Sequence, residues 1–553
     1  MAMRPRAAAL LAVAAAFTLT GPQVVDRWSV DAAAADSDKA ILHILNRIGY
    51  GPRPGDIEKV REMGLERYID QQLHPEKLAD AGMEARLAGL ETVHLSSRQI
   101  SEQYEQPQIE MRRQRQLQAG NNGNNGQPPD PSTMTPEMRR AMQANQQQAQ
   151  SVLLELQEQK LLRAVYSDKQ LQEVMADFWF NHFNVDARKG RVRFLLTEYE
   201  RESIRPHVLG KFRDLLEATA KSPAMLFYLD NFQSVSPDAA TNQGRRNARP
   251  TVARGRIQIP FPQQPPAQAR PNAPRGINEN YARELMELHT LGVDGGYTQK
   301  DVTEVARAFT GWSIDNPRQG GGFVFNARLH DEKDKVVLGH QLKSGGIKDG
   351  QDVLDILASQ PATARFISTK LARRFVSDTP PKTLVDRLAA KFTSTKGDIR
   401  EVMRTLLTSP EFQSPDAYRA KVKTPLEFVV SSVRATGADI VSARPLVNAM
   451  QQLGMPLYQC QPPTGYKDTA EAWTNTGALV SRMNFATMLS GNRQLGMGPQ
   501  QMRSLQSRDG LDSLIEDVLG NDIADTTRAT IAKATNPPQM LALTLGSPEF
   551  QRR

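Results

Sequence analysis

Residues 278–312 read NENYARELMELHTLGVDGGYTQKDVTEVARAFTGW, a stretch that packs ionisable side chains densely into two helical patterns. In the first pattern, spacings of three and four residues place polar side chains on one helix face and apolar side chains on another. The glycine-rich segment 292–296 ends this helix, and Thr298 with Asp301 is typical of a capping pair that opens a second helix over residues 299–310. The polar face comprises Asn280, Arg283, Glu284 and Glu287, and the apolar face Ala282, Leu285, Met286 and His289.

The second helix presents Arg307 on its polar side, where the guanidinium can meet a carboxylate of the first helix. We therefore expect Arg307 to pair with Glu284 or Glu287. Such a pair is either a buried structural network or part of an active site, and the sequence leaves both interpretations open.

Helical periodicity of 3.6 residues dominates the rest of the chain. One exception is a predicted β-hairpin that pairs residues 323–325 with 336–338 across the polar turn HDEKD. The motifs TSPEFQ at Thr408 and GSPEFQ at Gly546 are typical of helix starts, with serine as the cap and proline in the first turn. The predicted fold class is mainly α.

Two segments are poor in large apolar residues and predict disordered insertions, at about residues 117–134 and 234–277. An insertion is tolerated where its ends already meet, so we expect the flanks of the second insertion to lie close together. Residues 36–553 are then one large helical domain with a small β-hairpin and two insertions.

Residues 1–35 have the pattern of a signal peptide, because Arg4 and Arg6 precede an apolar run over residues 7–19. This run is too short to span a bilayer, and an A-x-A cleavage pattern ends at Ala35. An uncleaved anchor is the alternative. Cys460 is the single cysteine, which excludes an intramolecular disulfide. The sequence thus predicts a periplasmic or secreted protein without a transmembrane segment after the signal.

The net charge of +8 is concentrated in one segment. Residues 234–277 contain seven arginines and one acid, which leaves the remaining body near neutrality. Nucleic-acid binding requires a basic stripe on the folded surface, and the sequence shows none. We expect no nucleic-acid partner.

Five motifs resemble the bacterial domain-of-unknown-function family numbered 1800, and the similarity covers nearly all of the chain after residue 38. They are HILNRIGYGPRPGDI from His43, FWFNHFNV from Phe178, NENYARELMELHTLG from Asn278, DVTEVARAFTGW from Asp301 and PATARFISTKLARRFV from Pro361. The resemblance implies an exported protein that is often encoded beside an alkaline-phosphatase-like or sulfatase-like exported protein. It implies no catalytic residue. A later segment, QPPTGY from Gln461, departs from the family by having Tyr466-Lys467-Asp468 in place of a tryptophan-centred turn, so no role is predicted for it.

Metal binding is disfavoured by helix geometry. At about 100° per residue, the side chain of His289 points well away from those of Glu284 and Glu287, so the three cannot hold one ion on a regular helix. His182 and His289 both fall among apolar residues. They are either core histidines or bases that converge in a shared buried pocket. No metal is predicted, and no cofactor can be named.

The sequence therefore predicts a polar site of acids and amides. The motif DFWFNHFN aligns Asp177, Asn181 and Asn184 on one helix face, and tryptophans can stack against a sugar ring. The candidate catalytic residues are Glu284, Glu287, His289 and His182, and the candidate substrate-binding residues are Asn181, Asp230, Asn280, Arg283, Arg307 and Trp312.

Two function classes follow. The first is an exported enzyme that acts on an envelope or extracellular polymer. The alternative is a non-catalytic partner or maturation factor for a neighbouring exported phosphatase-like or sulfatase-like protein. A solvent-open pocket with unpaired acids favours the enzyme, and a closed, ion-paired core beside an apolar patch favours the partner.

Overall fold

The computed structural model describes residues 38–121, 135–239, 276–491 and 522–553, with a few positions between 512 and 519. The predicted signal peptide and most of the two predicted insertions lie outside these residues. The described part is mainly helical, which confirms the predicted fold class. None of its helices is both long and apolar enough to cross a membrane.

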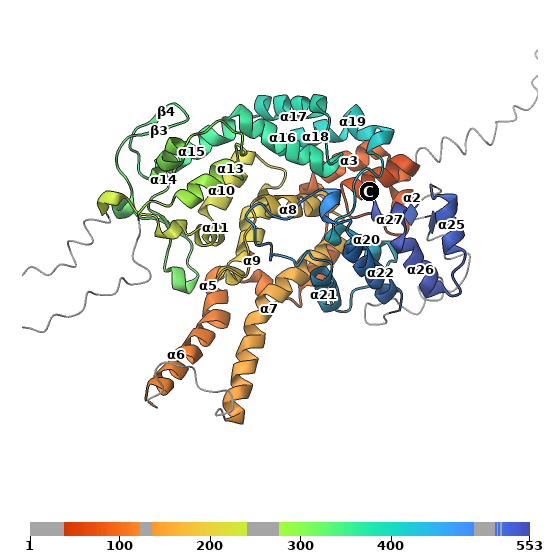
Figure 1. Cartoon of the computed structure of the whole chain (residues 1–553), viewed down its shortest axis with the longest axis horizontal. Coiled ribbons are helices and arrows are strands. Elements are labelled where there is room, and N and C mark those ends of the chain that lie inside the picture. Colours follow the sequence, from red (N-terminus) through yellow and green to blue (C-terminus); the bar gives the residue numbers. More distant parts are fainter. Residues whose placement is uncertain are drawn as a thin grey trace, which may run out of the picture.

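The helical elements follow one another along the chain (Figure 1). They are a helix over residues 38–47, α2 (Asp56–Met63), α3 (Leu65–Leu73), α4 (Ala81–Leu87), α5 (Ser97–Ile100), α6 (Gln106–Asn121), α7 (Pro136–Tyr166), α8 (Gln170–His182), α9 (Leu196–Glu198), α10 (Phe212–Lys221), α11 (Pro223–Tyr228), α13 (Glu279–Glu287), α14 (Gln299–Ala308), α15 (Ile347–Ser359), α16 (Pro361–Phe375), α17 (Lys382–Ser394), α18 (Ile399–Leu407), α19 (Pro410–Gln413), α20 (Pro425–Ala435), α21 (Arg444–Gln452), α22 (Thr476–Gly491), α25 (Asp525–Ile531), α26 (Pro537–Gly546) and α27 (Pro548–Gln551).

The helix pair predicted from residues 278–312 forms as α13 and α14. Thr298 caps α14, and Asp301 closes the capping box. The serines of the two SPEF motifs likewise cap α19 and α27, as predicted: Ser409 accepts from the amide of Phe412, and Ser547 accepts from that of Phe550.

The predicted hairpin pairing is wrong. β2 (Phe323–Phe325) pairs antiparallel with β1 (Trp312–Ile314), and β3 (Lys335–Val337) pairs with β4 (His340–Leu342). The second hairpin closes through Leu338 and Gly339, which both have positive φ. Such a two-residue turn matches the twist of paired strands, so β3 finds its partner locally.

The flanks of the second insertion lie together, as expected. The amide of Val235 donates to the carbonyl of Gly276 at 3.0 Å, and the side chain of Asn278 donates to the carbonyl of Leu229 at 2.7 Å. Val235 is buried. Residues 234–236, at the start of the second predicted insertion, are therefore packed into the fold. Residues 117–121, at the start of the first predicted insertion, are the end of α6.

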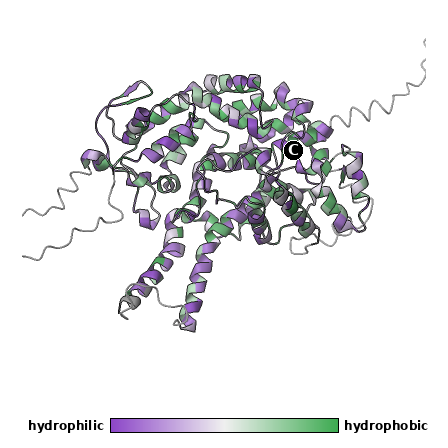
Figure 2. Cartoon of the chain, viewed as in Figure 1, coloured by the Kyte–Doolittle hydropathy of each residue, from purple (hydrophilic) through white to green (hydrophobic). Residues whose placement is uncertain are grey.

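Two helices project from the body as an arm, α6 and the first half of α7 (Figure 1). At the base of the arm, Tyr104, Ala149 and Val152 pack against Phe194. Figure 2 shows mixed hydropathy along the arm, whereas the main core unites apolar residues from most of the helices, with Trp179 and Trp312 fully buried.

A buried ion cluster joins three distant segments of the chain. Glu427, in the first turn of α20, lies 2.9 Å from a guanidinium nitrogen of Arg374 on α16 and 2.8 Å from Nε of Arg553. All three side chains are at most 4% exposed. Burial alone raises the pKa of Glu427, but the charges of Arg374 and Arg553 together lower it to about 2. The carboxylate therefore stays ionised as the shared counter-ion.

Candidate active site around Lys370

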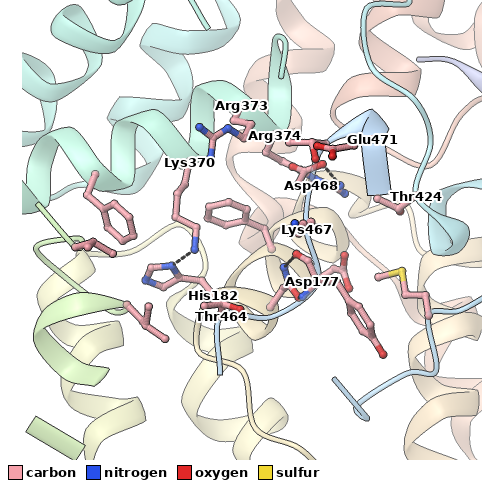
Figure 3. Close-up of a pocket in the computed structure, with 18 of the residues that line it drawn as sticks. Asp177, His182, Lys370, Arg373, Arg374, Thr424, Thr464, Lys467, Asp468 and Glu471 are labelled. Atoms are coloured by element: carbon pink, nitrogen blue, oxygen red, sulfur yellow. Dashed lines mark hydrogen bonds and ion pairs between the residues drawn. The ribbon is translucent and has the colours of Figure 1, made fainter. Parts of the chain in front are cut away.

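A cavity of about 570 Å³ opens between α8, α16 and the segment that carries residues 464–471 (Figure 3). The start of α20 and the turn after α13 complete its wall. Its ionisable lining residues are Asp177, His182, Glu287, Lys370, Arg373, Arg374, Lys467, Asp468 and Glu471. The volume lies within the range of small-molecule sites in proteins.

Helix periodicity explains how α16 supplies its cations. Lys370, Arg373 and Arg374 are spaced by three and four residues, which places them on one side of the helix. The adjoining face of the helix buries Ile367 and Leu371 in the core. The three cations consequently reach the same cavity wall.

Lys370 and His182 are in direct polar contact in this wall. The Nζ atom of Lys370 lies 2.8 Å from Nδ1 of His182, and Nε2 of His182 lies 3.1 Å from the carbonyl oxygen of His289 (Figure 3). A carbonyl oxygen can only accept, so Nε2 carries the proton and Nδ1 accepts from Lys370. Burial, followed by the charge of Lys370, holds the pKa of His182 well below its ordinary value. The imidazole is therefore neutral.

Lys370 itself loses its proton more readily than an ordinary lysine. Burial, and next the charge of Arg373, lower the pKa of its amine to about 8, while the carboxylate of Asp468 acts in the opposite direction. A lysine with such a pKa supplies a free amine at mildly alkaline pH, which can serve as a base or as a nucleophile.

His289 lies next to His182, on the side away from the cavity. Their ring centroids are 6.3 Å apart, and His289 is 3% exposed. Burial, with the charge of Lys370, lowers the pKa of His289 to about 3. The two histidines thus converge in one buried region, but only His182 lines the cavity.

The carboxylates of the cavity differ in their partners. Asp177 pairs with Lys160 at 2.8 Å, and Asp468 pairs with Lys421 at 3.3 Å. Glu287 accepts from the Tyr297 hydroxyl at 3.1 Å. Glu471 forms no ion pair with any described residue. Acids that keep free acceptor capacity therefore face an open cavity.

Asn181 has a positioning role. Its amide nitrogen donates to the carbonyl of Tyr466 at 2.9 Å, and its oxygen accepts from the Tyr466 amide at 2.7 Å. These reciprocal bonds fasten the segment from Tyr466 to α8. Gly465 makes the approach feasible, because a Cβ there would lie 2.2 Å from the carbonyl oxygen of Asn181.

The predicted pairing of Arg307 is wrong. Its guanidinium pairs with Glu304, one turn earlier on α14, at 2.8 Å and with Asp331 at 3.0 Å. Asp331 lies just before β3, which packs on α14 and presents a buried carboxylate there. The facing polar stripes of α13 and α14 are joined instead by Gln299, which accepts from Arg283 at 2.6 Å and donates to Glu279 at 2.9 Å.

The other predicted residues lie apart from the Lys370 cavity. Asn280 and Glu284 line a second cavity of about 670 Å³, where burial and then the charge of Glu287 raise the pKa of Glu284. Asp230 pairs with Lys189 at 2.8 Å and borders a third cavity. Trp312 is fully buried against Phe309 and lines none of these three cavities.

The structure thus brings His182, Glu287 and Asn181 together at one cavity with His289 behind His182, and places Asn280 and Glu284 at a second cavity. The sequence interpretation missed Lys370 and Arg373, although their helical spacing beside an apolar stripe was visible in PATARFISTKLARRFV. It also assigned no role to Lys467 and Asp468. Among the described residues, no three His, Cys, Asp or Glu side chains gather as ligands of one metal.

Fold and cavity define a mainly helical protein with a lysine–histidine pair in the wall of an ionisable pocket. A family model described as protein of unknown function (DUF1800) matches residues 43–552, nearly the whole chain. The chain belongs to this family, as its motifs indicated. No curated protein and no solved structure matches it.

Proposed function

We propose that the chain is an exported enzyme whose active site is the Lys370 cavity, and whose substrate is a polar component of the envelope or of an extracellular polymer. The observation that carries this proposal is the 2.8 Å contact between the Lys370 amine and a neutral imidazole in the wall of an accessible cavity. The buried lysines Lys335 and Lys421 each pair with an aspartate, whereas Lys370 forms no ion pair with an acid among the described residues.

In this proposal Lys370 is the base. Its free amine takes a proton from the substrate, and Nδ1 of His182 accepts a hydrogen bond from the amine and holds it in position. Glu287 and Glu471 add carboxylates on the other walls, which suit hydrogen bonds to hydroxyl groups. The cavity volume accommodates one or two units of a polymer, so the enzyme acts on an end or a substituent.

The test is an exchange of Lys370 for methionine, which keeps an unbranched side chain and removes the amine. Purified protein is incubated with peptidoglycan fragments and envelope polysaccharides, and products are measured by mass spectrometry. We expect product formation to fall by about 100-fold or more, the usual contribution of a general base. Lys382→Met, at an exposed position on α17, is the matched control and leaves the rate unchanged. Rates of Lys370→Met within about twofold of the control contradict the proposal.

Export has its own test. The Arg4 and Arg6 pattern followed by the apolar run supports a cleaved signal. We expect N-terminal sequencing of protein recovered from the periplasm or the medium to begin near Asp36. Recovery only from the cytosol, with the sequence beginning at Met1 or Ala2, contradicts export.

A second candidate function is that of a non-catalytic partner or maturation factor for a neighbouring exported phosphatase-like or sulfatase-like protein. The arm of α6 and α7 favours it, since an extended pair of helices with few packed apolar residues suits contact with another molecule. Ile109 and Leu117 are 44% and 64% exposed on this arm. The enzyme requires the Lys370 cavity, whereas the non-catalytic partner requires the arm.

A further inference from the structure

The charges that line the Lys370 cavity are unevenly paired. Arg374 is neutralised by Glu427, and Asp177 by Lys160. Arg373 and Lys467 also line the cavity, but no carboxylate of the described residues forms an ion pair with either. The Nε of Arg373 donates only to the backbone carbonyl of Asp378, at 3.2 Å. Burial raises the pKa of Asp378 and the charge of Arg373 is among the effects that lower it, but the two side chains form no ion pair. A guanidinium on a cavity wall that is in no ion pair is a suitable partner for an anionic group of a ligand.

The same helix face positions a nucleophile beside this cation. Lys370 and Arg373 are one turn apart on α16, a spacing that separates Cβ atoms by about 5 to 6 Å. Figure 3 shows both side chains coming from this helix, with Lys370 extending to His182. A ligand that presents a carbonyl carbon to the amine and a carboxylate to the guanidinium would engage both groups.

We propose that the cavity binds a 2-oxo acid, whose carbonyl carbon forms an imine with the Lys370 amine while its carboxylate pairs with Arg373. This inference rests on the proposed function and names the substrate class of the same site. It changes the role of Lys370 from base to covalent nucleophile.

Formation of this imine requires no reactant other than the amine and the 2-oxo acid. The free amine attacks the carbonyl carbon, so a carbon–nitrogen bond forms and the carbonyl π bond becomes a hydroxyl group on a carbinolamine. The hydroxyl group then leaves as water while the carbon–nitrogen double bond forms. Both hydrogens of the amine end in this water. The first hydrogen passes from nitrogen to the former carbonyl oxygen and the second leaves with the hydroxyl group, while Nδ1 of His182, 2.8 Å from Nζ, orients the amine by accepting a hydrogen bond from it.

Reductive trapping tests the inference. The full chain is incubated at pH 8 with pyruvate or 2-oxogluconate and reduced with borohydride, and the modified peptides are mapped by mass spectrometry. We expect the adduct on Lys370 at about tenfold or more the extent on the exposed Lys382. A preference for 2-oxogluconate points to a sugar-derived ligand, and a preference for pyruvate points to a small free acid.

Two controls separate binding from general amine reactivity. Hydroxyacetone, which lacks the carboxylate, is expected to label Lys370 at least about fivefold less than pyruvate. Arg373→Gln is expected to lose the preference for pyruvate while keeping the thermal transition of the wild type. Equal labelling of Lys370 and Lys382, or no adduct on Lys370, overturns the inference. The proposed function stands in that case if Lys370→Met still abolishes product formation, and both fail if it does not.

Discussion

Exchange of Glu427 for glutamine is expected to lower the free energy of unfolding by about 3 to 5 kcal/mol, the usual cost of removing one partner from a buried ion pair. Glutamine keeps the size of the side chain and removes its charge. Arg374 and Arg553, both at most 4% exposed, then share no buried counter-ion. Urea denaturation followed by circular dichroism measures the change, provided that the slope of the transition stays constant.

The matched control is Glu411→Gln. Glu411 pairs with Arg387 at 2.8 Å, but the arginine is 44% exposed, so water can replace the interaction. We expect this variant to lose less than about 1 kcal/mol. An equal loss in the two variants contradicts the view that Glu427 is the buried hub of the cluster.

The same cluster predicts a pH dependence. The pKa of Glu427 falls from 4.5 to about 2 on folding, so the folded state favours its ionised form. The resulting stabilisation is fully present above pH 4.5 and is lost as the pH falls towards 2, by about 3 kcal/mol in total. The difference in stability between the wild type and Glu427→Gln is therefore expected to shrink over this interval.

Much of the fold was predictable because its signals are local. The periodicity of residues 278–312, the cap formed by Thr298 and the SPEF helix starts each depend on residues a few positions apart. The predicted strand pairing was wrong because each strand had two possible partners. Residues 323–325 had a partner in β1, immediately after α14, whereas β3 closed on β4 through the turn at Leu338 and Gly339.

The candidate site was predicted less well because it depends on contacts between distant segments. His182 meets Lys370 across 188 residues, and Asn181 meets Tyr466 across 285. No spacing rule connects such positions. Arg307 shows the same difficulty, since its partner Asp331 comes from a hairpin whose pairing the sequence did not determine. The helix faces were predictable, and their partners were not.

The second large expected effect is the lowered pKa of the Lys370 amine. A pKa of about 8 means that half of the molecules carry a free amine at pH 8, compared with roughly one in 300 for a lysine of ordinary pKa. Burial is the main cause, and the charge of Arg373 is the next. Arg373→Gln is therefore expected to raise the pKa of Lys370 part of the way towards its ordinary value.

The measurement that tests this account most directly is the titration of Lys370 by nuclear magnetic resonance, with carbon-13 at the Cε position of the lysines. Comparison with the spectrum of Lys370→Met assigns the signal, and the exposed Lys382 serves as the internal reference. We expect a midpoint at about pH 8 for Lys370, which moves upward in Arg373→Gln. A midpoint near the ordinary lysine value of 10.5, unchanged in Arg373→Gln, contradicts it.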